Sequence, residues 1–153
     1  MVDLTNIEND VTLKCSIEGY QFDQKDEPDD DWCNVKVELR QGNRKFEKTD
    51  PALEASDLIR IKGWFECLAR NELPSFAVLS FTEPCIEFAF LSKVDNRIRI
   101  SVNLSHELRP DFDLTQFRTK FDDWNIVFDL DGTDFERNIA SLSRAIELFP
   151  IRS

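Results

Sequence analysis

The sequence is poor in histidine, glycine and long apolar runs. Its 153 residues include one histidine, four glycines and one methionine. No apolar run approaches the roughly 20 residues that a membrane-spanning helix needs. The first ten residues, MVDLTNIEND, are too polar and acidic for a signal peptide. We therefore expect a cytoplasmic protein that does not bind a membrane.

The cysteines lack the spacing of a metal site. None of the four forms a C-x-x-C pair, and the only histidine, His106, has no partner at a ligand spacing. A zinc site would need several scattered side chains to converge. We predict no metal, no cofactor and no disulfide, and interpret the cysteines as small buried side chains in a reducing compartment: Cys15, Cys33, Cys67 and Cys85.

Basic residues are also scarce relative to acidic ones. Nineteen Lys and Arg face thirty Asp and Glu, which gives a net charge of −11 and a pI of about 4.5. Such a chain is repelled by nucleic acid and by anionic membranes, and is attracted to basic surfaces. We expect a protein partner rather than a nucleic acid. The sequence leaves the oligomeric state open between a monomer and a weak dimer.

The hydrophobic pattern predicts one α+β domain over residues 1–153. Alternation of apolar and polar residues, with short turns, predicts a mostly antiparallel sheet of about six to seven strands. Two helices, at about 52–71 and 133–149, carry apolar stripes and should pack on one face of the sheet. Asp50 and Pro51 are the expected start of the first helix. Thr133 and Glu136 are the expected capping box of the second. The expected strands are 11–18, 32–40, 44–47, 76–82, 86–92, 97–104 and 124–130.

The stretch IVFDLDGT, residues 126–133, raises the alternative of an enzyme. An apolar strand followed by D-x-D-G-T resembles the first motif of magnesium-dependent phosphatases of the haloacid dehalogenase superfamily, which would make Asp129 the nucleophile and Asp131 the acid and base. Only 24 residues follow Asp129 (153 − 129), too few to supply the other motifs of that site. We therefore favour a turn followed by a helix cap, and predict no catalytic residues.

Five short motifs, in order, resemble the WapI-type immunity proteins. The resemblance covers about residues 10–112, and the segment 113–153 carries no motif that we associate with the family. The motifs are Gly19-Tyr20-x-Phe22, Asp31-Trp32-x-Asn34-Val35-x-Val37, Thr49-Asp50-Pro51-x-Leu53, Phe81-Thr82-Glu83-Pro84-x-Ile86-x-Phe88 and Leu104-Ser105-x-Glu107-x-Arg109-Pro110.

This resemblance implies a non-enzymatic protein that neutralises a cognate secreted toxin. A toxin that cleaves transfer RNA must grip phosphates and is basic, so an acidic inhibitor would be steered to it. The alternatives are the phosphatase and a small-ligand or scaffold module with a deep apolar pocket. Without a partner, the acidic run at 23–31 is interpreted as a solvated loop. Trp32 is then interpreted as a core residue at the start of a strand. The expected contacting residues are Asp23, Asp26, Glu27, Asp29, Asp30, Asp31, Trp32, Glu83, Glu107 and Arg109.

Overall fold

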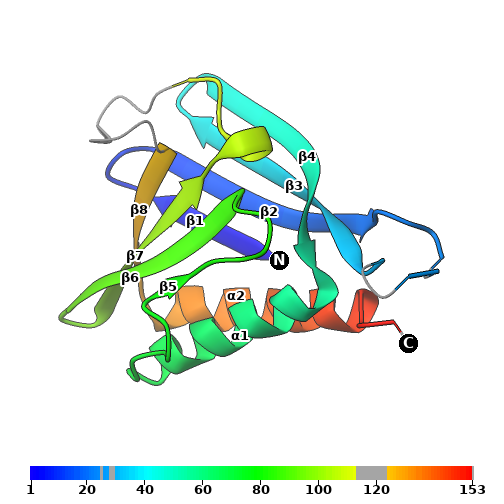
Figure 1. Ribbon diagram of the computed structural model, residues 1–153. Helices are drawn as coiled ribbons and strands as arrows, with labels where there is room; N and C mark the ends of the chain where they lie inside the picture. Colours follow the sequence, from blue (N-terminus) through cyan, green and yellow to red (C-terminus); the bar gives the residue numbers. More distant parts are fainter. Residues whose placement is uncertain (25, 28–29, 113–123, 153) are drawn as a thin grey trace.

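Two four-stranded antiparallel sheets and two helices make up the described part of the chain. The computed structural model describes residues 1–24, 26–27, 30–112 and 124–152. The first sheet has the order β1-β2-β3-β4 and the second the order β5-β6-β7-β8 (Figure 1). The strands are β1 Val2–Asn6, β2 Val11–Tyr20, β3 Trp32–Gln41, β4 Arg44–Glu54, β5 Val78–Leu79, β6 Ile86–Val94, β7 Arg97–Leu104 and β8 Trp124–Leu130. The helices are α1 Ala55–Ala69 and α2 Gly132–Leu148, and His106–Leu108 forms a 3-10 turn, η1.

The α+β class and the antiparallel pairing are confirmed, with eight strands in two sheets. The alternation predicted buried faces correctly: Val35, Val37 and Leu39 of β3 are all fully buried. The strand β1 was not predicted. The expected strand 76–82 is reduced to Val78–Leu79, since most of that segment forms the connection from α1.

Both helices lie side by side on the same side of the molecule, against the open end of the sheets (Figure 1). Their apolar stripes join the inward faces of both sheets in one hydrophobic core. Phe65 of α1 is fully buried and contacts three rings edge-on: Trp64 at 5.6 Å, Phe88 at 5.9 Å and Phe135 at 6.0 Å between centroids. This aromatic group joins α1, α2 and the second sheet.

The predicted starts of both helices were wrong. Pro51 lies within β4, and α1 begins after Glu54, whose side chain exchanges capping bonds with Asp57. The second helix begins after Asp131 rather than Thr133, and its box partner is Asp134 rather than Glu136. At each helix, the residue that caps the N-terminus lies a few positions from the predicted one: Glu54 instead of Asp50, and Asp131 instead of Thr133. Local sequence does not decide between them, because the strand before the helix sets where it begins.

Three of the four cysteines are buried as expected, and Cys67 is only half-buried. Burial raises the pKa of the Cys15 thiol to about 12, and burial with the nearby Asp31 raises that of Cys33 to about 11. The thiolate form is therefore scarce at neutral pH, and these thiols are poor nucleophiles. All four cysteines are free.

Candidate functional site

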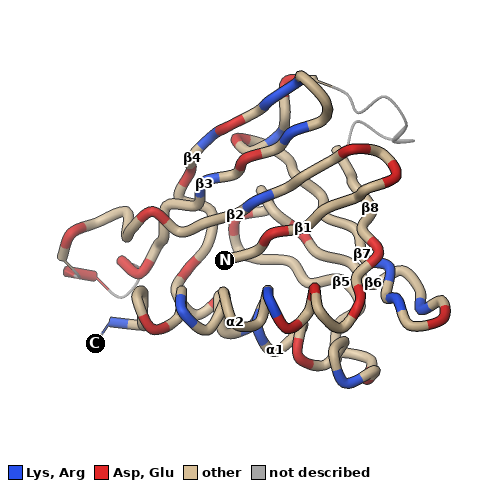
Figure 2. The backbone as a smooth tube through the Cα atoms, turned by 180° about the vertical axis from the view of Figure 1, so that it is seen from behind, with Lys and Arg blue, Asp and Glu red and all other residues tan. Residues whose placement is uncertain are grey.

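The acidic loop, residues 23–31, connects β2 to β3 at one end of the first sheet. Figure 2 shows it as an acidic projection next to the C-terminal end of the chain. Asp23, Asp26 and Glu27 are exposed, and Asp30 is half-buried. Asp29 lies outside the described residues. The exposed carboxylates of Asp23, Asp26 and Glu27 give this projection a local negative charge.

Asp31 does not belong to that exposed group, which corrects the prediction. Its side chain is only 11% exposed and forms an ion pair with Arg152, with 3.0 Å between Nε and Oδ1. The backbone N–H of Arg152 also donates to both carboxylate oxygens. A buried carboxylate with these partners stabilises the base of the loop and is not available to another protein.

Asp30 also has a partner inside the loop. Its Oδ2 accepts hydrogen bonds from the backbone N–H groups of Asp26, at 2.8 Å, and Glu27, at 2.7 Å. An aspartate side chain that accepts hydrogen bonds from nearby backbone N–H groups stabilises a tight turn. Asp30 therefore shapes the loop, while the side chains of Asp23, Asp26 and Glu27 are exposed to solvent.

Trp32 begins β3 and is half-exposed. The core interpretation of this residue is wrong, because Asp31 and Cys33 occupy the buried positions on either side of it. A partly exposed tryptophan beside a charged loop has the character of an interface anchor. Trp32 therefore remains in the candidate surface.

A second acidic group, which we call the motif cluster, consists of Asp50, Glu83 and Glu107. It forms where β4 meets η1 and the turn before β6, near the buried Cys85. Lys48 lies 3.8 Å from Glu107 (Nζ to Oε2) and partly balances the charge. Sequence reasoning identified Glu83 and Glu107 separately but assigned Asp50 to a helix cap. Their convergence depends on contacts between the two sheets.

Burial, and then the carboxylates of Glu107 and Glu83, raise the pKa of Asp50. The Asp50 carboxyl thus binds its proton more tightly in the folded protein than in the unfolded chain. Asp50 therefore adds stability below its ordinary pKa, and this contribution is lost as the pH rises through the raised value.

Replacing Asp50 with Asn should therefore stabilise the fold at neutral pH. After allowance for solvent screening, we expect a gain of about 0.5 kcal/mol in the free energy of unfolding at pH 7. At pH 3, where Asp50 is protonated, the variant and the parent should be equally stable. Urea unfolding at both pH values measures the effect, with Asp95→Asn as an exposed control. A loss of stability at pH 7 would contradict the assignment.

The aspartates of IVFDLDGT have structural partners. Asp129 forms two hydrogen bonds with the guanidinium of Arg99, at 2.8 and 2.9 Å, and this pairing lowers the pKa of its carboxyl. Asp131 is the N-cap of α2 and accepts a bond from the N–H of Asp134 at 2.9 Å. The strand β8, which carries Asp129, lies in an antiparallel sheet, not in the parallel sheet of the phosphatase alternative. Among the described residues, no cluster of three or more His, Cys, Asp or Glu side chains is placed to hold a metal.

The capping role makes a direct prediction. Replacing Asp131 with Ala removes the acceptor for a helix N–H and should lower the melting temperature by about 3 °C. Asp131→Asn keeps a capping oxygen and should retain most of that stability. A thermal scan by circular dichroism compares them, and equal losses in both variants would refute the capping role.

A hollow near these aspartates lies where β1 meets β8. Its volume is about 420 Å³, and charged or polar side chains line much of it, including Asn6, Arg97, Arg99 and Asp129. The ligand-binding alternative predicts a deep apolar pocket instead. This hollow does not have that character.

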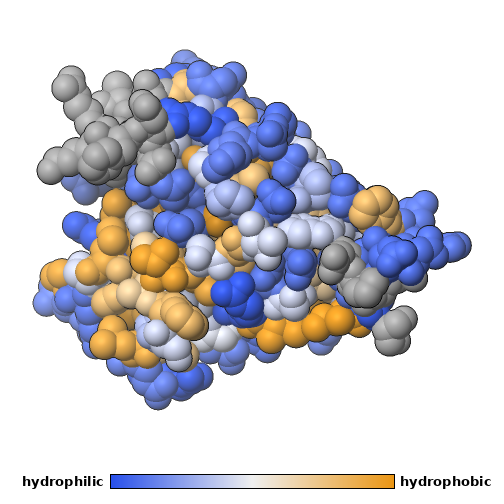
Figure 3. Space-filling model, in the orientation of Figure 1, coloured by the Kyte–Doolittle hydropathy of each residue, from blue (hydrophilic) through white to orange (hydrophobic). Residues whose placement is uncertain are grey.

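Exposed apolar side chains form a separate patch over β5, β6 and the connection after α1 (Figure 3). We define the apolar patch as Leu73, Phe76, Val78 and Leu91, which are 48–77% exposed. The indole N–H of Trp64 donates to the carbonyl of Phe76 at 3.0 Å and fixes this connection to α1. Such a patch is a second candidate contact surface.

Comparison with known proteins assigns the family. A model of the Immunity protein WapI-like family matches residues 3–150. The chain belongs to the WapI-like immunity protein family. The match extends beyond the resemblance at 10–112 and includes the C-terminal region with β8 and α2. No curated protein and no solved structure matches the chain.

The WapI-like motifs meet at one end of the two sheets. The first two are joined where the N–H of Gln21 donates to the carbonyl of Trp32 at 2.7 Å, and the third pairs with the second through Asn34 opposite Pro51. The last two are joined where the N–H of Ser105 donates to the carbonyl of Cys85 at 3.0 Å. The motif cluster then connects Asp50 of the third motif to the last two.

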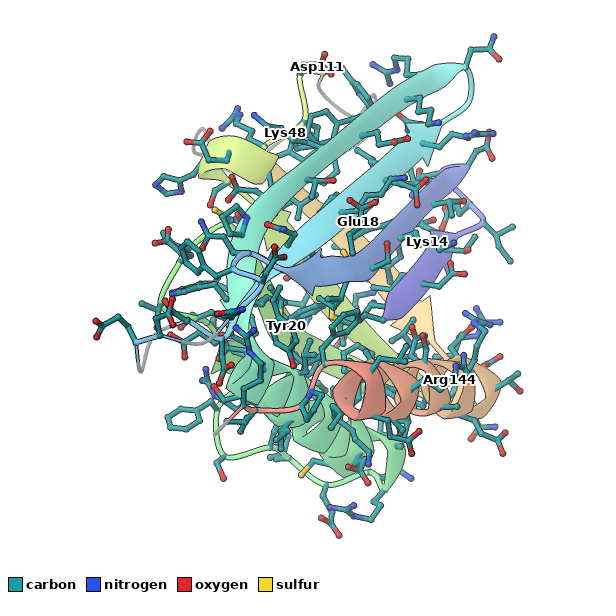
Figure 4. All side chains as sticks on the ribbon, turned by 90° about the vertical axis from the view of Figure 1, so that its right-hand side faces the viewer. Lys14, Glu18, Tyr20, Lys48, Asp111 and Arg144 are labelled. Atoms are coloured by element: carbon teal, nitrogen blue, oxygen red, sulfur yellow. The ribbon has the colours of Figure 1, made fainter. Side chains whose placement is uncertain are left out.

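The remaining charged and polar candidates are less organised. Figure 4 shows Lys14 and Glu18 on the outer face of the first sheet. There Lys36 lies within 4 Å of three carboxylates, those of Glu18, Glu38 and Glu47, so these charges are paired within the protein. His106 and Arg109 are exposed beside the motif cluster, and the ring Nδ1 of His106 lies 3.1 Å from the hydroxyl oxygen of its neighbour Ser105. No described helix is both long and apolar enough to cross a membrane.

Proposed function

We propose that this protein binds and neutralises a cognate secreted toxin, a basic nuclease domain of the kind that cleaves transfer RNA, in the cytoplasm. The observation that carries the proposal is membership of the WapI-like immunity family over nearly the whole chain. The net charge of −11 supports a basic partner, because opposite net charges accelerate association.

The contact surface that we propose combines the acidic loop with the motif cluster. Both acidic groups are next to β4. The acidic loop meets the end of this strand, where the N–H of Ala55 donates to the carbonyl of Asp31. Asp50 of the motif cluster lies within the strand, four residues before its last residue, Glu54. Four strand residues span about 13 Å, which fits within one protein interface of ordinary size. Asp23, Asp26, Glu27, Glu83 and Glu107 would stand where substrate phosphates otherwise bind.

Trp32 supplies the apolar contact within this surface. It lies directly after the acidic loop and pairs with Glu54 at the end of β4, between the two acidic groups along the strand. Interfaces place aromatic anchors at their centre and charges at the rim. This arrangement would let the carboxylates steer a basic toxin while Trp32 is buried on contact.

Protection of a cell tests the function directly. The toxin domain encoded beside this gene is expressed from an inducible promoter, with and without this protein. The proposal predicts growth arrest with the toxin alone and restored growth with both. A matched control carries the immunity gene with an early stop codon. If the intact protein leaves the growth arrest unchanged, the proposed function is wrong for that toxin.

A further inference from the structure

One arginine holds both ends of the acidic loop. The guanidinium of Arg152 donates to the carbonyls of Phe22, at 3.1 Å, and Asp23, at 3.3 Å, where the loop begins. It also donates to the carbonyl of Asp30 and to the carboxylate of Asp31, where the loop ends. A single side chain thus ties together two segments that lie between 121 and 130 residues away from it in sequence.

The surroundings of Arg152 fix its position. Its guanidinium lies over the ring of Tyr20, 3.9 Å from the ring centroid, and the hydroxyl of Tyr20 donates to the carbonyl of Pro150. The ring of Phe149 packs edge-on against Tyr20 at 5.7 Å. Figure 4 shows Tyr20 at the end of β2, above the helix that leads to this segment. The Arg152 side chain is mostly buried, with 19% exposure.

Arginine suits this role better than lysine does. Its planar fork presents five N–H donors in fixed directions and stacks on an aromatic ring, whereas a lysine ammonium does neither. The loop also carries a high density of like charge, which favours open conformations. A cation at its base offsets that repulsion at the point where the two ends meet.

We propose that Arg152 is the positioning residue that holds Asp23, Asp26, Glu27 and Asp30 of the acidic loop in the arrangement that meets the toxin. This inference rests on the proposed function. Without the Arg152 side chain, the ends of the loop lose their shared partner, and the exposed carboxylates sample many arrangements. Binding must then order the loop, which weakens the affinity.

Charge alone predicts the opposite result, which makes the test sharp. Arg152→Ala changes the net charge from −11 to −12 (−11 − 1), and a more acidic protein attracts a basic toxin more strongly. Arg144→Ala makes the same charge change at an exposed position within α2, away from the loop (Figure 4). The two variants therefore separate position from charge.

The experiment measures the loop and the binding independently. Hydrogen exchange follows the amides of Asp26 and Glu27, which donate to Asp30, and calorimetry measures affinity for the toxin domain. For Arg152→Ala we expect exchange at least about tenfold faster and affinity about tenfold weaker. Arg152→Lys should fall between it and the parent. Arg144→Ala should exchange like the parent and bind as tightly or slightly more tightly.

Each outcome decides between the claims. Unchanged exchange in Arg152→Ala would overturn the proposal, whether or not a toxin is bound. Faster exchange with unchanged or tighter binding would overturn the link between the loop conformation and the affinity. If the parent protein binds no toxin, the proposed function fails, and the exchange data still show whether Arg152 holds the loop. Thermal unfolding of each variant confirms that the rest of the fold is intact.

Discussion

Replacing Phe65 with Ala is expected to lower the free energy of unfolding by about 4 kcal/mol. Phe65 is fully buried and contacts Trp64 of its own helix, Phe88 of β6 and Phe135 of α2. Removing the ring leaves a cavity where both helices and the second sheet meet. Several elements would have to move together to fill it, which places the cost near the upper end of such substitutions.

A conservative variant provides the control. Phe65→Leu keeps most of the apolar volume and should cost about 1.5 kcal/mol or less. Chemical denaturation with urea measures both variants by the shift of the midpoint at constant slope. If Phe65→Ala loses less than about 1 kcal/mol, the helices and sheets do not share the single core described above.

The second large effect concerns the acidic loop. Replacing Asp23 and Asp26 with Asn and Glu27 with Gln should weaken binding of the toxin by about 10- to 30-fold at low salt. The three carboxylates are exposed, so their removal should leave the fold intact. Most of the loss should appear in the association rate, because these charges act before contact is made. The parent and the variant should converge at high salt, where exposed charges are screened.

A matched variant separates local from net charge. Three exposed acids elsewhere can be neutralised with the same change, from −11 to −8 (−11 + 3), in a protein that keeps its acidic loop. These replacements are Glu8→Gln, Asp95→Asn and Glu136→Gln. They should reduce the association rate by about twofold or less. Equal losses in both triple variants would show that overall charge, and not the loop, attracts the toxin.

The apolar patch offers the clearest rival surface. Phe76 is 67% exposed and held in place by Trp64, so Phe76→Asp changes the patch without disturbing the core. The acidic-surface proposal expects this variant to bind the toxin as the parent does. If Phe76→Asp abolishes binding while the loop variant binds normally, the toxin docks on the apolar patch instead.

The sequence predicted the strands better than the boundaries of the helices. Strands at 97–104 and 124–130 were predicted with their full bounds, because alternation of large apolar residues defines both the strand and its buried face. Asp50 and Pro51 look like the start of a helix, yet Asp50 lies opposite Val35 and continues the strand. Pairing with β3 outweighs the local preference. The division into two sheets depends on contacts between distant strands, which no local pattern encodes.

The candidate surface was also predicted only in part. Local composition identified the acidic loop, and the motifs identified Glu83 and Glu107. The burial of Asp31 could not be predicted, because its partner Arg152 is 121 residues away. The same is true of the convergence of Asp50 with Glu83 and Glu107. Residues of one sequence motif therefore have different roles in the structure. In the second motif, Asp31 is buried and holds the loop, whereas Trp32 is partly exposed.

The most direct test of the account is a calorimetric titration of this protein with the candidate toxin domains encoded by neighbouring genes, at 50 mM and 500 mM salt. We predict tight binding that weakens by at least about tenfold at the higher salt, as expected for an acidic inhibitor on a basic toxin. Tight binding that is indifferent to salt would contradict the acidic-surface mechanism. No binding at either salt concentration would contradict the proposed function itself.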